Sequence, residues 1–324
     1  MHDPHSGHGH GHEHAHHHPA QHHGHGHHHH HHGAHAGSGY AVGFALNLAF
    51  VLIEGTAGVL TNSLALLADA GHNLSDLCTL AIAWTAAVLS RRRPSARYTY
   101  GLRGSSIWAA LINALLLMAV CGAITWEALR RLADPTPVHE LTVMAVAAIG
   151  VVINTATALM FMRGRDEDLN RRGVFLHMAA DAAISLGVVI AGGLMLWTGW
   201  LWLDAAASLA VVAVIAISTW SLLKDSVAMA LHAVPPGINP AAVAEFLRTL
   251  PGVAAIHDLH IWGMSTAETA LTVHMVVPGE RPGDAFYCEL SGELEKRFGI
   301  HHSTVQVECG DSNNPCRLAP EDVV

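Results

Sequence analysis

The sequence predicts a membrane-embedded, all-α bundle of six helices, followed by a small α+β domain. Apolar residues make up 51% of the 324 residues and charged residues only 13%, against about 25% charged in typical soluble proteins. Six apolar runs each approach the ~20 residues that cross a bilayer as a helix. Beyond them the chain turns polar and shows short helix and strand patterns. Together these features indicate a membrane protein with one polar domain.

Charge and cysteine content narrow the functional classes. The formal net charge is −9 and no sustained basic patch is present, so nucleic acid is not expected as a partner. The five cysteines include no Cys-x-x-Cys pair, which argues against a disulfide scaffold and a four-cysteine zinc module. Histidine is the unusual residue, with 28 against 17 lysines and arginines combined. That excess points to a transition metal.

Residues 1–39 are expected to form a disordered, histidine-rich, metal-binding tail. They hold 19 of the 28 histidines, mixed with Gly, Ala and Ser, and cannot build an apolar core. They also lack the charged and apolar regions of a signal peptide. The unbroken histidine run at 27–32 resembles a purification tag, but the interspersed pattern HGHGHEHAHHH favours a native segment. Because imidazole binds several divalent metals, the tail indicates metal without indicating a mechanism.

Residues 40–232 are assigned to the membrane bundle. Its six predicted helices cover approximately residues 40–60, 64–89, 105–129, 138–162, 174–197 and 200–223. The links at 61–63 and 198–199 are so short that the first two and the last two helices are expected to form tight hairpins. Interfacial aromatic residues are expected near membrane surfaces, and three tryptophans gather at the second hairpin: Trp197, Trp200 and Trp202.

The distribution of arginine sets the expected orientation. Two links, after the second and the fourth helix, hold nine arginines, whereas the links on the other side hold two. The nine are Arg91, Arg92, Arg93, Arg97, Arg103, Arg163, Arg165, Arg171 and Arg172, and the two are Arg130 and Arg131. By the positive-inside rule the nine-arginine side is cytoplasmic. An even number of spans then places both termini in the cytoplasm, and we expect the protein in a bacterial inner membrane.

Residues 233–310 are predicted to form the α+β domain, and residues 311–324 a tail. The chain breaks at Pro235, Pro236 and Gly237. The elements then expected are a helix at 241–249, strands at 254–262 and 269–277, a helix at 283–298 and a strand at 303–308. The order αββαβ suggests a ferredoxin-like domain.

Two identical patterns carry ionisable residues into the predicted membrane helices. His72 and Asp76 lie in LADAGHNLSDL of the second helix, and His177 and Asp181 lie in LHMAADAAISL of the fifth. This H-x-x-x-D spacing places both side chains on one helix face, about 5–6 Å apart. Ionisable groups in a bilayer are costly and face a bundle interior or a watery cavity. Two imidazoles and two carboxylates supply the four donors of a tetrahedral Zn²⁺ site, so we expect one shared site.

Other readings of these polar residues stay open. Each pair could be a hydrogen bond within one helix and nothing more, although the repetition beside a histidine-rich tail favours a shared metal site. Asp69, one turn before His72, is either a carboxylate that orients the imidazole, which we favour, or a polar helix-packing group. Four further residues are expected to hydrogen-bond between helices or to line the path: Asn47, Glu54, Asn113 and Asn154.

These stretches resemble the cation diffusion facilitator family. The resemblance rests on SLALLADAGHNLSDL, HMAADAAISLGVV, RYTYG before the third helix and HDLHIW in the α+β domain, and it covers about residues 40–308. It implies a homodimeric metal(II)/proton antiporter with six helices and a cytoplasmic ferredoxin-like domain. It also implies that His72, Asp76, His177 and Asp181 form the transport site, a type of quartet associated with zinc and often with cobalt or cadmium.

The resemblance also implies a metal site in the α+β domain. His257, His274 and Glu308 stand at the strand positions that supply ligands. His260, three residues after His257, is expected on the opposite face of the strand, as a structural or dimer-interface residue. Further candidate ligands are His232, His301 and His302.

Two segments are not expected to bind metal. The link 91–101 has no His, Asp, Glu or Cys, so the loop metal site of some family members is not expected. Cys309 and Cys316 could supply soft ligands, but six residues separate them. We expect both to be ordinary reduced thiols.

The expected function is proton-coupled export of Zn²⁺ from the cytoplasm, with Zn²⁺ also as a regulatory ligand, no cofactor and no enzymatic activity. The partners are divalent metal ions, protons, the lipid bilayer and a second copy of the chain. One alternative is an exporter mainly of Co²⁺, Ni²⁺ or Cd²⁺, because imidazole and carboxylate ligands serve several ions. A second is a non-transporting metal sensor or store. An intramembrane metalloenzyme is disfavoured, since no His-Glu-x-x-His pattern occurs and four ligands leave no position for water.

Overall fold

The computed structural model describes residues 38–90, 94–162, 169–310 and 315–319. The expected histidine-rich tail lies outside the described residues, apart from its last two positions. Five of the nine arginines used for the orientation also lie outside them.

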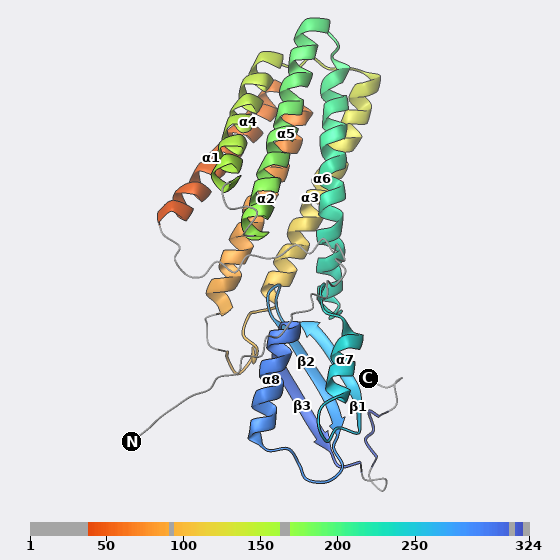
Figure 1. The fold of residues 1–324 in the computed structure, drawn as a ribbon. Helices are drawn as coiled ribbons and strands as arrows, with labels where there is room; N and C mark the ends of the chain where they lie inside the picture. Colours follow the sequence, from red (N-terminus) through yellow and green to blue (C-terminus); the bar gives the residue numbers. More distant parts are fainter. Residues whose placement is uncertain (1–37, 91–93, 163–168, 311–314, 320–324) are drawn as a thin grey trace, which may run out of the picture.

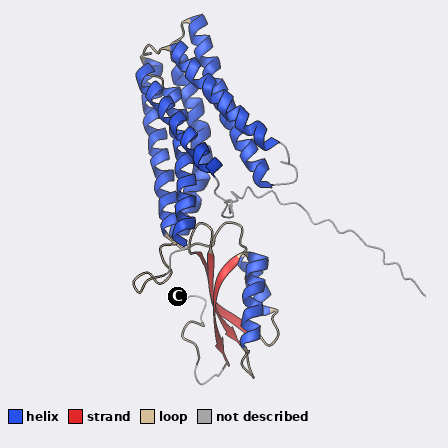
Figure 2. Ribbon diagram, turned by 90° about the vertical axis from the view of Figure 1, so that its left-hand side faces the viewer, coloured by secondary structure: helices blue, strands red, loops and turns tan. Residues whose placement is uncertain are grey.

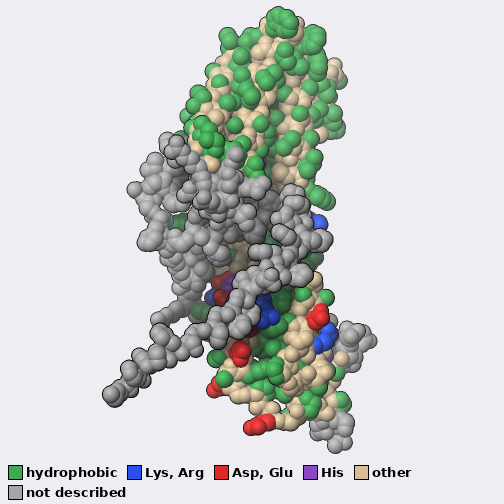
Figure 3. Space-filling model, viewed as in Figure 1, with side chains coloured by type: hydrophobic (Ala, Val, Ile, Leu, Met, Phe, Trp, Pro, Cys, Tyr) green, Lys and Arg blue, Asp and Glu red, His purple; other side chains and the backbone are tan. Residues whose placement is uncertain are grey.

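Six long helices form an elongated bundle above a smaller α+β domain (Figure 1). They are α1 (Ser38–Thr61), α2 (Leu64–Ser90), α3 (Ser105–Ala133), α4 (Glu140–Met162), α5 (Leu169–Thr198) and α6 (Trp202–Ala230). Within the described part of the chain, four stretches are long and apolar enough to cross a membrane, and they lie in α3, α4, α5 and α6. The part of the bundle visible in Figure 3 shows hydrophobic side chains among backbone and other side chains, whereas the charged side chains that can be seen lie toward the α+β domain.

Short turns close both predicted hairpins. Asn62 has a φ of 59°, a left-handed conformation that asparagine tolerates better than most residues, and the next residue, Ser63, donates its N–H to the carbonyl of Gly58 at 3.0 Å. Gly199 has a φ of 71° and its N–H donates to the carbonyl of Met195 at 2.8 Å. Glycine in this conformation is a common helix terminator. The predictions of a tight α1–α2 turn and a tight α5–α6 turn are therefore confirmed.

The α+β domain consists of α7 (Pro240–Arg248), β1 (Ala255–Gly263), β2 (Thr269–Val276), α8 (Asp284–Phe298) and β3 (Ile300–Glu308). This is the predicted order αββαβ. Its three-stranded sheet has the order β1-β2-β3, with β1 antiparallel and β3 parallel to β2. Both helices lie on one face of the sheet (Figure 2).

Alternation along the strands decides which side chains face away from the two helices. Leu271, Val273 and Met275 of β2 are fully buried in a core with side chains of α7 and α8. Because successive side chains of a strand point to opposite faces, His274 lies on the other face. By the same alternation, Val305 and Val307 of β3 pack against the core and Glu308 shares the face of His274.

The predicted position of His260 is wrong, because β1 contains a bulge. His257 pairs with His274 and His260 pairs with Thr272, with a register shift between the two pairs. Asp258 has a φ of 51° at this point. A bulge adds one residue to one strand of the pair. The partners His274 and Thr272 are two residues apart in β2 and lie on the same face. His257 and His260 therefore share one face of the sheet.

Candidate metal centres

Helices α2 and α5 bring together the four residues of the predicted quartet, His72, Asp76, His177 and Asp181. Nε2 of His72 lies 3.3 Å from Oδ1 of Asp181, and Nε2 of His177 lies 3.2 Å from Oδ2 of Asp76. The contacts within each helix are longer, at 3.7 Å for His72–Asp76 and 3.6 Å for His177–Asp181. Each imidazole therefore approaches the carboxyl group of the other helix more closely than its own. Two independent hydrogen bonds within single helices would not give this crossed arrangement.

Exposure differs across the quartet. The side chains of Asp181 and His72 are 3% and 12% exposed, whereas those of Asp76 and His177 are 35% and 44% exposed. Donor atoms of His72, Asp76 and Asp181 all lie within 4.8 Å of one another. Nδ1 of His72 is buried and has no hydrogen-bond partner in the described structure. Asp181 and His72 are thus enclosed by the bundle, whereas Asp76 and His177 are partly exposed.

Polar residues around the quartet connect the helices. Asn73 of α2 donates to Glu54 of α1 at 3.0 Å, and Asn113 of α3 donates to the hydroxyl of Ser75 in α2 at 3.0 Å. Glu54 and Asn113 therefore form the interhelical hydrogen bonds that the sequence suggested, and Asn154 is buried. Asn47 is exposed.

A second polar cluster lies on the uncovered face of the sheet. Oε1 of Glu308 lies 3.4 Å from Nε2 of His257 and 3.1 Å from Nδ1 of His274. The two imidazole rings are in edge contact, with centroids 5.2 Å apart. The structure thus brings together the three residues that the sequence singled out in this domain.

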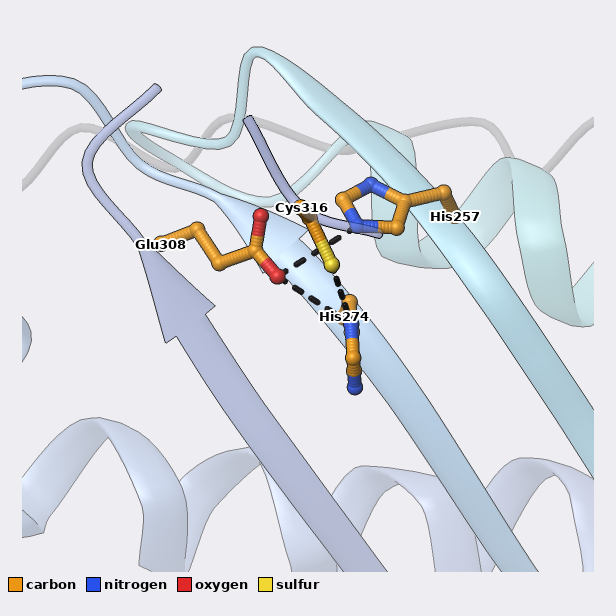
Figure 4. A group of neighbouring side chains, drawn as sticks. All are labelled: His257, His274, Glu308 and Cys316. Atoms are coloured by element: carbon orange, nitrogen blue, oxygen red, sulfur yellow. Dashed lines mark hydrogen bonds and ion pairs between the residues drawn. The ribbon is translucent and has the colours of Figure 1, made fainter. Parts of the chain in front are cut away.

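Two further residues join this second cluster: Cys316, which the sequence analysis set aside as an ordinary thiol, and Asp258, which it did not consider. Sγ of Cys316 lies 3.5 Å from Nδ1 of His274. Asp258 contacts Nε2 of His274 at 3.5 Å and Nε2 of His260 at 2.8 Å. Only its position beside His257 could have drawn attention to Asp258. Cys316 was set aside because of its spacing from Cys309, whereas its contact is with His274 (Figure 4).

The neighbours of Glu308 and Cys316 shift their pKa values in opposite directions. Burial raises the pKa of the Glu308 carboxyl, but hydrogen bonds from Cys316 and Gln306 and the two imidazoles outweigh it, so the net pKa is lowered. A backbone hydrogen bond at Leu318 lowers the pKa of the Cys316 thiol, but the hydrogen bond to Glu308 and its charge outweigh this, so the net pKa is raised.

The other candidate ligands lie apart from both clusters. His232, His301 and His302 are exposed. The ring of His302 contacts that of Tyr100, with centroids 5.6 Å apart. The structure therefore supplies no shared ligand position for these three histidines among the described residues.

Comparison with known families extends over nearly all of the described chain. The family model described as "Cation efflux transmembrane domain" matches residues 40–229. The family model described as "Cation efflux protein, cytoplasmic domain" matches residues 235–309. The chain belongs to the cation diffusion facilitator family. The resemblance seen in the sequence is thereby confirmed.

Several relatives in this family cover most of the chain. The metal cation efflux system protein CzcD of Cupriavidus metallidurans is 35% identical over 279 residues, which are 86% of this chain and 87% of the relative. The zinc transporter ZitB of Escherichia coli is 35% identical over 278 residues, 85% and 88% of the two chains. The cadmium, cobalt and zinc/H(+)-K(+) antiporter of Bacillus subtilis is 33% identical over 278 residues, 84% and 89% of the two chains. Their names describe transporters rather than enzymes.

Proposed function

We propose that this protein exports Zn²⁺ from the cytoplasm in exchange for protons, through the quartet of His72, Asp76, His177 and Asp181. The observation that carries the proposal is the crossed contact between α2 and α5, in which each imidazole faces the carboxyl group of the other helix. Two nitrogens and two oxygens in one place match the tetrahedral preference of Zn²⁺. The names of two similar relatives include zinc, and one of those two is named as an antiporter.

The donor set accounts for the exchange of metal against protons. Metal binds neutral imidazole and ionised carboxylate, so binding expels the protons that these groups hold. After the bundle reopens to an acidic exterior, His72 and His177 can take up protons, because histidine changes its charge near neutral pH. Protonation weakens the site and releases the metal. The protonated quartet also avoids carrying two uncompensated carboxylates back through the apolar bundle.

The proposal includes a membrane topology. All six helices α1 to α6 cross a bacterial inner membrane, and both termini lie in the cytoplasm. The side that holds nine arginines faces the cytoplasm, in agreement with the positive-inside rule. The α+β domain, which we take to be ferredoxin-like, then lies in the cytoplasm, where it pairs two copies of the chain and responds to metal.

Removal of one ligand tests the site assignment. In reconstituted vesicles, His177→Ala and Asp76→Ala are expected to reduce zinc-driven proton flux by at least about tenfold, the loss that follows even from removing an outer partner of a metal site. His139→Ala, which removes an exposed histidine, should transport normally. Wild-type flux in either quartet variant would overturn the assignment.

The metal preference is tested separately. The same vesicles, under an imposed pH gradient, are supplied with Zn²⁺, Co²⁺, Ni²⁺ or Cd²⁺. We expect the fastest uptake with Zn²⁺. Faster uptake of Co²⁺, Ni²⁺ or Cd²⁺ would favour the alternative in which the geometry of the site selects that ion. No uptake of any ion would favour a non-transporting sensor or store.

A further inference from the structure

Two acidic side chains outside the quartet, Glu54 of α1 and Asp69 of α2, are fully buried in the bundle. Their carboxyl groups contact each other. The two helices pack closely at this point, because a Cβ on Gly55 would lie 3.8 Å from the Cβ of Ala70. Helices α1, α2 and α4 contain no lysine or arginine, so none of them supplies a basic side chain to neutralise the pair.

Each of the two carboxyl groups has one oxygen with a donor and one without. Oε2 of Glu54 accepts a hydrogen bond from Asn73 at 3.0 Å. Oδ2 of Asp69 accepts one from Ser185 at 2.9 Å. The other two oxygens, Oε1 of Glu54 and Oδ1 of Asp69, are buried and have no hydrogen-bond partner among the described residues. Since buried polar atoms are nearly always hydrogen-bonded in native structures, these two acceptors require a donor.

The pair lies on the enclosed side of the quartet. Asp69 is one turn before His72 in α2, and its partner Ser185 is one turn after Asp181 in α5. Because α2 and α5 run in opposite directions at the quartet, both steps lead toward the end of the bundle that holds the two hairpin turns. The two partly exposed members of the quartet lie one turn in the other direction. The pair is therefore remote from the exposed part of the site.

We propose that Glu54 and Asp69 share one proton, and that this proton stays on the pair while the quartet exchanges its own protons for metal. A protonated carboxyl group donates one hydrogen bond, so one proton between Oε1 of Glu54 and Oδ1 of Asp69 pairs both atoms. The proton, taken from solvent as the bundle folds, leaves one negative charge in place of two. It thereby removes the repulsion between two adjacent carboxylates in an apolar interior.

The shared proton completes a bridge across three helices. The bridge runs from Glu54 of α1 to Asp69 of α2 and on to Ser185 of α5, with Asn73 as a second contact between α1 and α2. Helices α2 and α5 carry the quartet, so Glu54 and Asp69 are positioning residues for it. This inference rests on the proposed function and deepens it, because it assigns the exchanged protons to the quartet alone.

Infrared spectroscopy detects the shared proton without any transport, because a protonated carboxyl group absorbs at a higher frequency than a carboxylate. The purified full-length protein is measured at neutral pH, where exposed carboxyl groups are ionised. We expect a protonated-carboxyl band that Glu54→Gln and Asp69→Asn each remove, since the remaining acid then accepts a bond from the new amide. Glu280→Gln changes an exposed residue outside the bundle and should keep the band. Saturating Zn²⁺ should also leave it in place.

The infrared outcomes separate this inference from the transport proposal. A spectrum in which Glu54→Gln removes no such band would overturn the shared proton, whether or not the protein transports zinc. Loss of the band on addition of Zn²⁺ would show that the pair takes part in the exchange, and would overturn its retention of the proton. Absence of zinc transport with the band intact would leave the shared proton standing and count only against the proposed function.

Thermal unfolding in detergent tests the bridge. Glu54→Ala leaves buried acceptors unpaired and should lower the unfolding midpoint by about 3 °C or more. Glu54→Gln should keep the wild-type midpoint, because its amide donates to Asp69 and accepts from Asn73. Thr56→Ala is the control on the same helix, since the exposed Thr56 hydroxyl bonds to the backbone of α1. If Glu54→Gln unfolds as early as Glu54→Ala, a second charge and not a shared proton holds the helices, and the proposal is wrong.

Discussion

Asp69 is fully buried in α2, one turn before His72, and accepts a hydrogen bond from Ser185 Oγ of α5 at 2.9 Å. Ser185 in turn lies one turn after Asp181, in a confined space: a Cβ on Gly150 of α4 would lie 3.2 Å from its hydroxyl. The bond therefore fixes α2 against α5 at the level of the quartet. At the residue scale, this contact favours a helix-packing role for Asp69 over an orienting contact with His72.

Ser185→Ala tests that role. The substitution leaves a buried carboxyl oxygen of Asp69 without a partner, which costs about 1–3 kcal/mol of stability. We expect a lower thermal midpoint in detergent and an unchanged KM for zinc in vesicles. Ser218→Ala is the control, because among the described residues the Ser218 hydroxyl bonds to the backbone of its own helix. A raised KM at an unchanged midpoint would instead assign Asp69 to the orientation of His72.

The sequence predicts which side chains share a face of one helix or strand. It does not predict which side chains of different helices and strands contact each other. The H-x-x-x-D spacing identifies which side chains share a helix face, because the helical period is fixed. It does not reveal that His72 faces Asp181 more closely than Asp76, which depends on how α2 and α5 are aligned. Cys316 was set aside as an ordinary thiol for the same reason, since its return to the sheet is a tertiary contact. For His260, strand alternation failed at the bulge.

At the scale of the element, the start of α2 is held by α6. Asp204, in the first turn of α6, accepts hydrogen bonds from the Ser63 hydroxyl at 2.6 Å and from the Leu64 N–H at 3.0 Å. The first N–H groups of a helix have no partner within the helix. A carboxyl group from a neighbouring helix supplies one here, beside the local cap in which the Ser63 hydroxyl accepts a hydrogen bond from the Leu66 N–H at 3.4 Å. The same contact sets the position of α2, which carries His72 and Asp76.

Asp204→Ala is expected to lower the free energy of unfolding by about 1.5–3 kcal/mol, the range for hydrogen bonds to a charged group. Thermal unfolding in detergent measures the change. Asp204→Asn should recover part of the loss, because the amide oxygen can still accept a bond. Asp134→Ala removes an exposed aspartate and serves as the control. If Asp204→Ala unfolds at the wild-type midpoint, the interhelical cap does not stabilise the bundle.

Hydropathy locates apolar segments better than it locates helix ends. The predicted end at residue 223 precedes Lys224 and Asp225, where the sequence becomes polar. Helix α6 nevertheless continues to Ala230, because a helix needs no change of backbone conformation where its surroundings become polar. Its end coincides instead with His232, whose φ is 59°.

At the scale of the whole molecule, the bundle and the α+β domain meet at the turn between β1 and β2. Arg103, just before α3, contacts Glu268 of this turn at 2.6 Å, and the N–H of Thr266 donates to the Ser106 hydroxyl at 3.1 Å. The register from Gly263–Thr269 to His257–His274 places the polar cluster of His257, His274 and Glu308 toward the other end of the same hairpin. In the metal-responsive role proposed for this domain, a change at the cluster would reach the bundle along these two strands.

Charge reversal at the junction tests whether the two domains act together. Glu268→Arg places two guanidinium groups against each other at a partly buried contact, so it should separate the β1–β2 turn from α3. Since α3 packs against α2 and α6, we expect zinc flux in vesicles to fall roughly fivefold. This loss corresponds to about 1 kcal/mol, the upper range for a partly exposed ion pair.

Adding Arg103→Glu restores the opposite charges and should restore the flux. Glu280→Arg, which changes an exposed residue after β2, controls for the added charge. A double variant no more active than Glu268→Arg would show that the pair does not couple the domains, because only a direct interaction predicts mutual rescue.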